Sequence, residues 1–297
     1  MSGYPIDLRS KAPTASWPPH WLDIPGSHRF VRVAQWGLGA YERYLAGEGD
    51  EWLAVLEPAI EYLLSTQVDS GPRQGAWLEP LPSRHTFFIP GSWPSAMAQG
   101  ECASLLVRVY LETGKEELAQ AAIRALAPLS RSTADGGVQA RLRGHSFPEE
   151  YPTTPPSFVL NGAMFALWGV HDVWRGLDDA AARHQFLAGT DMLVENLPLW
   201  DLGYWSRYDL YPHRAPRNVA SPSYHRLHIT QLRAYHRLEP RPELAAMADR
   251  FEAYAGRPAN LVRAYLHKVA FRLIVPSGPR FAGLSRAGKP RVGPANL

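Results

Sequence analysis

Apolar residues recur at helical spacing through most of the chain. Between residues 29 and 46 they are Phe30, Val33, Trp36, Leu38, Tyr41 and Leu45, and Gly47 ends the segment. The same pattern predicts further helices at 51–66, 95–113, 116–129, 157–175, 179–195, 222–237, 241–255 and 259–273. No strand alternates regularly with these helices, which argues against a doubly wound sheet. We therefore predict an all-α fold of paired helices, an (α/α) toroid or incomplete barrel.

The helix expected at 157–175 is apolar almost all round, which is typical of a fully buried helix. The residues just before it are Glu149, Glu150 and Tyr151, followed by prolines that keep the segment out of helix. A carboxyl group and a phenol thus lie just before the N-terminal end of a central helix. This placement suits a functional site on a loop held by a rigid scaffold. The alternative is an ordinary proline-rich connection whose tyrosine caps the core.

Two long irregular segments, 69–94 and 198–222, are rich in aromatic residues. Loops of this length in a compact domain are usually functional, or they contain unrecognised strands. Short strands are expected at 86–89 and 138–143. In a toroid the long loops would gather at one end and form the site.

The two ends of the chain differ from its middle. Residues 1–28 are rich in proline and aromatic residues and are predicted to form an arm packed on the body at 29–273. Residues 274–297 are predicted to be a basic tail rich in Pro and Gly, with little core of its own. The sequence shows no apolar signal-peptide core and no run of 18 apolar residues. We expect a soluble cytoplasmic protein without a membrane span.

The amino-acid composition limits the classes of ligand and partner expected for this chain. The 297 residues include 10 Trp and 13 Tyr, rings that serve as platforms for sugars or as core filler. Cys102 is the one cysteine, which excludes an internal disulfide framework and a cysteine-based zinc site. A net charge of +3 permits a polyanionic partner without requiring one. We expect no nucleic-acid partner and no cofactor.

A polar stripe marks the helix expected at 222–237. Tyr224, His228 and Gln231 lie on one face at helical spacing. That face lines either a ligand-filled cavity or the solvent, and the sequence does not decide between them. His225 and His228, with His213, also resemble metal ligands, but no carboxylate stands beside them at a familiar spacing, so we expect no metal.

Several ordered motifs together resemble the C-terminal catalytic domain of the D-glucuronyl C5-epimerases. The carriers are Ser95–Gly100, Glu149–Pro155, Phe158–Gly162, Tyr208–Leu210, and Tyr224 with His225, His228, Ile229, Gln231 and Leu232. Weaker similarities are Val33–Leu38 and Tyr4–Asp7. The resemblance implies an (α/α) toroid that converts D-glucuronate to L-iduronate in heparosan or heparan-type chains. A homodimer is one expectation for the assembly.

The resemblance implies that Glu150, Tyr151, Tyr208 and Tyr224 are the catalytic residues. Gln99 and Glu101 lie about 200° apart on their helix, so only one of them can face a pocket. We expect the uronate polysaccharide to be bound by aromatic, charged and amide side chains of the loops and motifs: Arg84, Trp93, Gln99, Glu101, Arg143, Asn161, His228 and Gln231.

The chain departs from the family pattern in two ways. The β-rich parts of the animal enzymes, expected between the first helix and the toroid, are missing. Tyr211 follows Leu210, where the family has an arginine expected to hold a carboxylate. Arg214 or Arg217 is a candidate replacement.

Other functions stay open at this stage. A polysaccharide lyase shares the abstraction of the C5 proton and then eliminates the C4 substituent. A glycoside hydrolase needs two carboxylates across a cleft, which Glu150 with Asp209 or Glu101 could supply. A sugar-binding homologue without activity is the non-enzymatic alternative.

Overall fold

The computed structural model describes residues 3–22, 29–84, 86–214 and 216–275. The α-helices in these ranges are α1 (Arg29–Leu45), α2 (Glu51–Ala54), α3 (Leu56–Thr66), α4 (Ala96–Thr113), α5 (Glu116–Arg124), α6 (Leu160–Leu177), α7 (Ala180–Asn196), α8 (Pro222–Leu238), α9 (Pro242–Ala255) and α10 (Pro258–Ile274). The short strands are β1 (Leu78–Glu79), β2 (Ser83–Arg84), β3 (Phe88–Ile89), β4 (Trp93–Pro94), β5 (Gln139–Leu142) and β6 (His145–Pro148).

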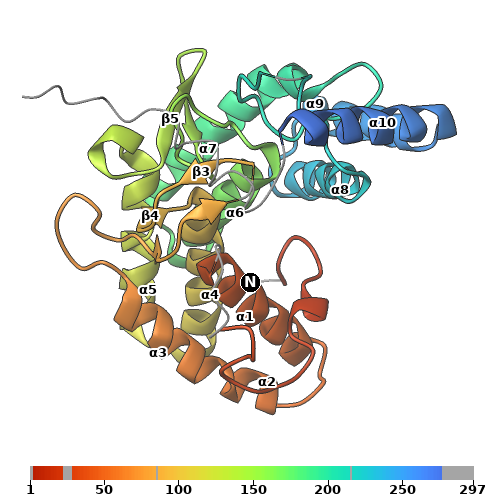
Figure 1. Cartoon of the computed structure of the whole chain (residues 1–297). Helices are drawn as coiled ribbons and strands as arrows, with labels where there is room; N and C mark the ends of the chain where they lie inside the picture. The colour runs from red at the N-terminus through yellow and green to blue at the C-terminus, as the bar shows by residue number, and fades with distance from the viewer. Residues whose placement is uncertain (1–2, 23–28, 85, 215, 276–297) are drawn as a thin grey trace, which may run out of the picture.

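The helices form two layers (Figure 1). An inner row runs α1–α4–α6–α8, with each helix packed on the next. Helix α1 also packs against α2 and α3, and α4, α6 and α8 each pack against the helix that follows, so that α3, α5, α7 and α9 form the outer layer. This alternation of inner and outer helices along the chain is that of an incomplete (α/α) toroid, which confirms the predicted fold class.

The strands make three separate antiparallel pairs, β1 with β4, β2 with β3, and β5 with β6. Each pair lies in a connection that leads into an inner helix: the first two precede α4, and the third precedes α6. The expected strands at 86–89 and 138–143 correspond to β3 and β5, but their partner strands were not predicted.

Two helices end or break where a proline lacks its backbone N–H. The helix expected at 51–66 is divided at Val55, because Pro58 cannot donate a hydrogen bond to Ala54 four residues earlier. The helix expected at 116–129 ends at Arg124 for the same reason, because Pro128 cannot donate to Arg124. A short 3₁₀ turn, Ala127–Ser130, follows it.

The closest helix crossing joins α4 to α6. A side-chain carbon added at Gly169 would overlap the backbone oxygen and Cα of Gly100, and one added at Gly100 would overlap the Ala166 backbone. Glycine at both positions therefore lets the two backbones touch. Most residues of both helices are buried, because each is covered by neighbours on several sides.

The N-terminal segment 3–22 packs against the inner helices. Tyr4, Leu8 and Ala12 are buried in the main core, and the Tyr4 ring meets the Trp168 ring edge-on at 5.7 Å. Residues 23–28 and 276–297 lie outside the described ranges. The division into an arm at 1–28, a body at 29–273 and a tail at 274–297 stays a prediction. Within the described residues no helix combines the length and apolarity needed to cross a membrane.

Helix α10 lies beside α8 and α9 at one edge of the molecule (Figure 1). It leaves several large apolar side chains exposed: Leu261, Val262, Tyr265, Leu266, Val269, Leu273 and Ile274. The homodimer expected from the sequence stays a prediction.

The Gly100–Gly169 contact predicts a large effect of a small substitution. Gly169→Ala inserts a methyl group into a backbone contact that cannot open without moving α4 from α6. We expect the free energy of unfolding to fall by about 3 kcal/mol, as measured by urea denaturation.

Gly256→Ala is the matched control. Gly256 has an ordinary backbone conformation, and its nearest neighbour to an added carbon lies at 3.6 Å. We expect its stability to change by less than about 1 kcal/mol. Equal stability of the two variants would contradict a close α4–α6 crossing.

Candidate active site

A cavity of about 430 Å³ opens at the N-terminal ends of the inner helices. Its lining comes from the N-terminal segment, α1, α4, the loop before α6, and the first turns of α6 and α8. The lining residues are Ile6, Leu8, Lys11, Val31, Gln35, Met97, Glu150, Tyr151, Asn161, Phe165, Ser223, Tyr224 and Leu227. Helix N-termini carry partial positive charge, so this end of the fold favours an anion.

Glu150 is the carboxyl group of this lining. Its side chain is 4% exposed and lies directly against Gly162, where an added Cβ would overlap the carboxyl group. It shares a hydrogen bond with the Tyr151 hydroxyl, while Oε2 has no hydrogen-bond partner in the described ranges. Burial raises the pKa of Glu150 to about 8, although the bond from Tyr151 opposes this. The carboxyl group is therefore poised for proton transfer near neutral pH.

Three tyrosines extend from Glu150 in a chain. Tyr151 shares a hydrogen bond with Tyr208, and Tyr208 shares one with Tyr224. The rings of Tyr208 and Tyr224 meet edge-on, with their centroids 4.9 Å apart. Tyr151 and Tyr224 line the cavity, whereas Tyr208 is buried between them. The structure thus brings all four predicted catalytic residues together.

Packed rings fix these tyrosines. The Tyr151 ring stacks on Trp93 at 6.0 Å and lies 5.2 Å from Phe87. Trp93 and Phe87 belong, with Tyr151 and Tyr208, to a second hydrophobic cluster apart from the main core. Burial raises the pKa of Tyr151, Tyr208 and Tyr224 above its ordinary value, and the charge of Glu150 adds to that effect. Deprotonating any of them requires a nearby cation or a partner base.

Two cations lie close to Tyr208, and both come from α10. The Lys268 ammonium is 5.7 Å from the Tyr208 ring centroid and bonds to Asn218 Oδ1 at 2.7 Å. Arg272 donates to Thr86 and interacts electrostatically with Tyr208. Burial lowers the pKa of Lys268 to about 8, with repulsion from Arg272 adding to it. These cations offset part of the cost of a phenolate at Tyr208.

Glu149 has a structural role. Its carboxylate accepts hydrogen bonds from the backbone N–H and hydroxyl of Ser157 and from the backbone N–H of Phe158. Phe158 has a φ of 51°, in the left-handed region, and these bonds hold it there. Glu149 O also accepts from the N–H of Ala96 at 3.0 Å. The loop that carries Glu150 and Tyr151 is thereby tied to the first residue of α4 and to the residues just before α6.

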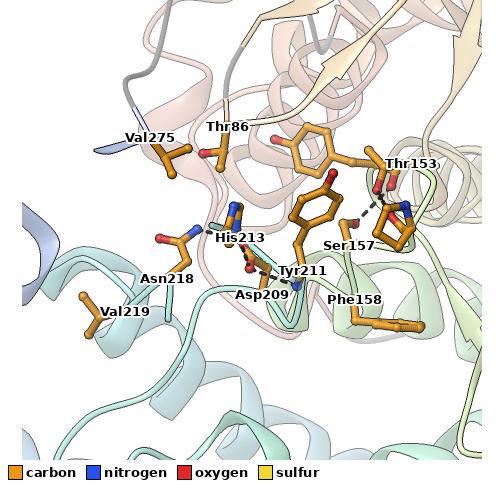
Figure 2. A network of polar contacts seen from close by, with 12 residues as sticks. Thr86, Thr153, Ser157, Phe158, Asp209, Tyr211, His213, Asn218, Val219 and Val275 are labelled. Carbon is orange, nitrogen blue, oxygen red and sulfur yellow. Dashed lines mark hydrogen bonds and ion pairs between the residues drawn. The ribbon is translucent and has the colours of Figure 1, made fainter. Parts of the chain in front are cut away.

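Asp209 fixes the conformation of the loop that leads into α8 (Figure 2). Its carboxylate is bonded to His213 Nε2 at 3.0 Å, the backbone N–H of Tyr211 at 3.2 Å and Asn218 Nδ2 at 2.5 Å. The backbone of Leu210 next to it donates to Ser157 O. Asp209 does not line the cavity, and Glu101 lies behind Gln35, which donates to it at 3.0 Å. Neither supplies the second carboxylate that the hydrolase alternative requires.

Three of the predicted binding residues lie at or next to the cavity. Asn161 lines it, and its Oδ1 has no partner among the described residues. Gln231 is buried and donates from Nε2 to Asn161 O at 3.1 Å. Trp93 stacks on Tyr151 and donates from Nε1 to Leu81 O. These residues support the wall around Glu150 and Tyr151.

Gln99 and Arg143 were wrong as cavity residues. The Gln99 amide is consumed by backbone groups of Gly75, Trp77 and Ala125, because α4 turns that face toward the outer layer. Arg143 lies in the exposed turn between β5 and β6, at the far end of the hairpin from Glu149. The Arg84 side chain lies outside the described part of the chain.

His228 and Gln231 on α8 are both fully buried. The alternative that this face of the helix is exposed to solvent is therefore wrong at these two positions. His228 Nδ1 lies 2.9 Å from Ser206 Oγ, which is also 2.8 Å from His225 Nδ1. Burial lowers the pKa of His228 to about 3, so its ring stays neutral. His225 Nε2 bonds to Phe251 O, so both ring nitrogens of His225 are engaged. Within the described ranges no group of three His, Cys, Asp or Glu side chains is arranged to hold one.

The polar residues at the site that were missed from the sequence are Lys11, Gln35, Ser223, Lys268 and Arg272. Gln35 belongs to one of the weaker family motifs, which gave no role for it. Lys268 and Arg272 stand four residues apart on α10, a spacing that places both on one helix face. No local signal marks Lys11, because only the fold of the N-terminal segment brings it to the cavity.

The raised pKa of Glu150 predicts how stability depends on pH. The folded state holds this proton up to about pH 8, whereas the unfolded chain releases it near pH 4.5. Stability should therefore fall as the pH rises through this window. Glu150→Gln removes this contribution, so the variant should be more stable than the parent by about 2 kcal/mol or more at pH 8.5, with little difference at pH 4.

Chemical denaturation across this pH range measures the effect. Glu57→Gln, which removes an exposed carboxylate on α3, controls for the change of charge. A constant stability difference between parent and Glu150→Gln at all pH values would contradict a buried carboxyl group that titrates late.

The chain was compared with known proteins. The family model described as "D-glucuronyl C5-epimerase C-terminus" matches residues 82–253. The chain is 33% identical over 215 residues to the D-glucuronyl C5-epimerase of Caenorhabditis elegans, which covers 66% of this chain and 34% of that protein. It is 28% identical over 144 residues to an uncharacterized protein of Methanocaldococcus jannaschii, covering 47% of this chain and 45% of that one.

A solved structure titled "UGL_D88N/dGlcA-Glc-Rha-Glc" aligns with a TM-score of 0.48 and 15% identity, over 79% of this chain and 61% of that one. The chain spans about a third of the length of the worm relative. The family model covers more than half of the chain, which confirms the resemblance drawn from the motifs. The chain belongs to the family of the D-glucuronyl C5-epimerase C-terminal domain.

Proposed function

We propose that this protein inverts C5 of D-glucuronate units, to L-iduronate, in a heparosan or heparan-type polysaccharide. The observation that carries the proposal is the chain of hydrogen-bonded groups from Glu150 through Tyr151 and Tyr208 to Tyr224, which begins and ends at one cavity. A volume of about 430 Å³ lies within the range of small-ligand sites. Membership of the family supports the same reaction class.

The reaction needs a base on one face of the sugar ring and an acid on the other. The C5 proton is weakly acidic because the adjacent carboxylate delocalises the electron pair left behind. In our proposal Tyr151, with Glu150 as its proton acceptor, acts on one face and Tyr224 acts on the other. One takes the C5 proton, the electron pair moves into an enolate-like intermediate, and the other returns a proton to C5 from the opposite side.

Tyr208 completes the path between the two faces. It is buried between Tyr151 and Tyr224 and shares hydrogen bonds with both. A proton gained by one tyrosine can pass through Tyr208 to the other, which restores the site without bulk water. Lys268 and Arg272 favour the charged form of Tyr208 during this transfer. Which of the outer tyrosines abstracts the proton depends on the direction of the reaction.

Exchange in deuterated water tests the function. Incubation with heparosan should place deuterium at C5 and produce iduronate signals by NMR. Tyr151→Phe should lower the exchange rate at least 100-fold with the fold intact by circular dichroism, because the phenyl ring keeps the packing and lacks the proton-carrying group. Undiminished exchange in the folded variant would remove Tyr151 from the mechanism. An unsaturated product absorbing in the near ultraviolet would indicate a lyase.

The Lys268 ammonium near Tyr208 and the Glu150 carboxyl group together predict how the exchange rate depends on pH. Exchange should rise as Glu150 loses its proton and fall as Lys268 loses its own, giving a maximum near pH 8. Lys268→Met should lower the maximal rate at least 10-fold. Lys268→Arg should keep the activity and extend it to higher pH, because guanidinium stays protonated.

Lys115→Met is the matched control, since Lys115 is an exposed lysine paired with Glu57 on the outer surface. Its rate and pH profile should equal those of the parent. An unaltered alkaline limb in Lys268→Arg would show that Lys268 does not set the profile.

A further inference from the structure

The N-terminal segment forms part of the cavity wall. Ile6, Leu8 and Lys11 line the cavity together with Glu150, Tyr151 and Tyr224. Lys11 ends a short 3₁₀ turn, Arg9–Lys11, that packs on α1. In the inner row α1 and α8 stand at opposite ends, so this wall and Tyr224 reach the cavity from different sides of the fold.

The backbone around Lys11 is held in place although its side chain is exposed. Leu8 and Ala12, on either side of the turn, are buried. Arg43 Nε donates to Ala12 O at 2.8 Å. Gly39 of α1 allows the close approach, since an added Cβ there would overlap the backbone oxygen of Leu8. The ammonium group of Lys11 is thus attached to a fixed point at the cavity.

The charged groups that line the cavity favour binding of an anion. Among the described lining residues Lys11 is the cation and Glu150 the carboxyl group. Glu150 is largely protonated below pH 8, so the lining is net positive at neutral pH. Within the described ranges Lys11 forms no ion pair, although it interacts electrostatically with the buried Glu101 behind Gln35. The residues expected to replace the family arginine, Arg214 and Arg217, are exposed and do not line the cavity.

We propose that Lys11 binds the carboxylate of the uronate unit whose C5 lies at Glu150 and Tyr151. This assignment rests on the proposed function, which places a uronate in this cavity. Negative charge grows on the carboxylate when the C5 proton leaves, so the ammonium group interacts more strongly with the intermediate than with the substrate. Lys11 therefore contributes both to binding and to the rate. The N-terminal segment becomes part of the active site and selects acidic over neutral sugars.

Binding and turnover are measured separately. Heparosan oligosaccharides and the same oligosaccharides with the carboxyl groups reduced are titrated by calorimetry into the Tyr151→Phe protein with and without Lys11→Met. Lys11→Met should weaken binding of the uronate form at least 10-fold and leave binding of the reduced form unchanged. In the otherwise unaltered protein it should raise KM and lower kcat for deuterium exchange, and Lys11→Arg should restore most of both.

Arg9→Met is the matched control, because Arg9 belongs to the same turn, pairs with Asp7 and does not line the cavity. Uronate binding unaffected by Lys11→Met, or an equal loss for the reduced oligosaccharide, would overturn the proposal, as would a parent protein that binds neither. A parent that binds uronate through Lys11 but shows no exchange would instead overturn the proposed epimerase reaction and leave this assignment standing.

Discussion

The backbone contact between α4 and α6 at Gly100 and Gly169 is the constraint on which the rest of the structure depends. It brings the backbones of two helices whose residues are mostly buried into direct contact. The N–H of Ala96, at the start of α4, then bonds to the carbonyl of Glu149 in the loop before α6. A packing requirement near the start of α4 and in the middle of α6 is thus combined with a hydrogen bond that holds the loop carrying Glu150 and Tyr151.

Burial raises the pKa of the acidic groups of the site, which favours proton transfer by the carboxyl group and disfavours ionisation of the tyrosines. Water is excluded from Glu150, Tyr151 and Tyr208, which raises the pKa of each and brings the carboxyl group into the range of proton transfer at neutral pH. The tyrosines move further from that range, so the site needs positive charge. The fold provides it through Lys268 and Arg272 beside Tyr208 and through the N-terminal ends of the inner helices. The neighbouring Glu149 and Asp209 act as rigid acceptors that hold the two loops.

Acidic residues with similar surroundings in the sequence have different roles here. Glu149 and Glu150 are adjacent, yet one accepts hydrogen bonds from Ser157 and Phe158 and the other faces the cavity. The chain bends at Glu150, just after strand β6, so the scaffold uses the Glu149 carboxylate while the Glu150 carboxyl group lines the cavity. On α4, by contrast, both polar side chains are used by the scaffold: the Gln99 amide bonds to backbone groups, and Glu101 accepts a hydrogen bond from Gln35.

The sequence by itself determined the helices, their approximate ends, the all-α class and the motif residues Glu150, Tyr151, Tyr208 and Tyr224. Helical periodicity and the local chemistry of proline and glycine are properties of neighbouring residues, so they can be recognised before folding. Only the tertiary structure decided which cations lie near these four residues. Arg143, Arg214 and Arg217 were expected from the sequence, but they are exposed and do not line the cavity. Lys11 and Lys268 come from its two ends, because the distance between charges in space is set by how the helices pack, which sequence separation does not encode.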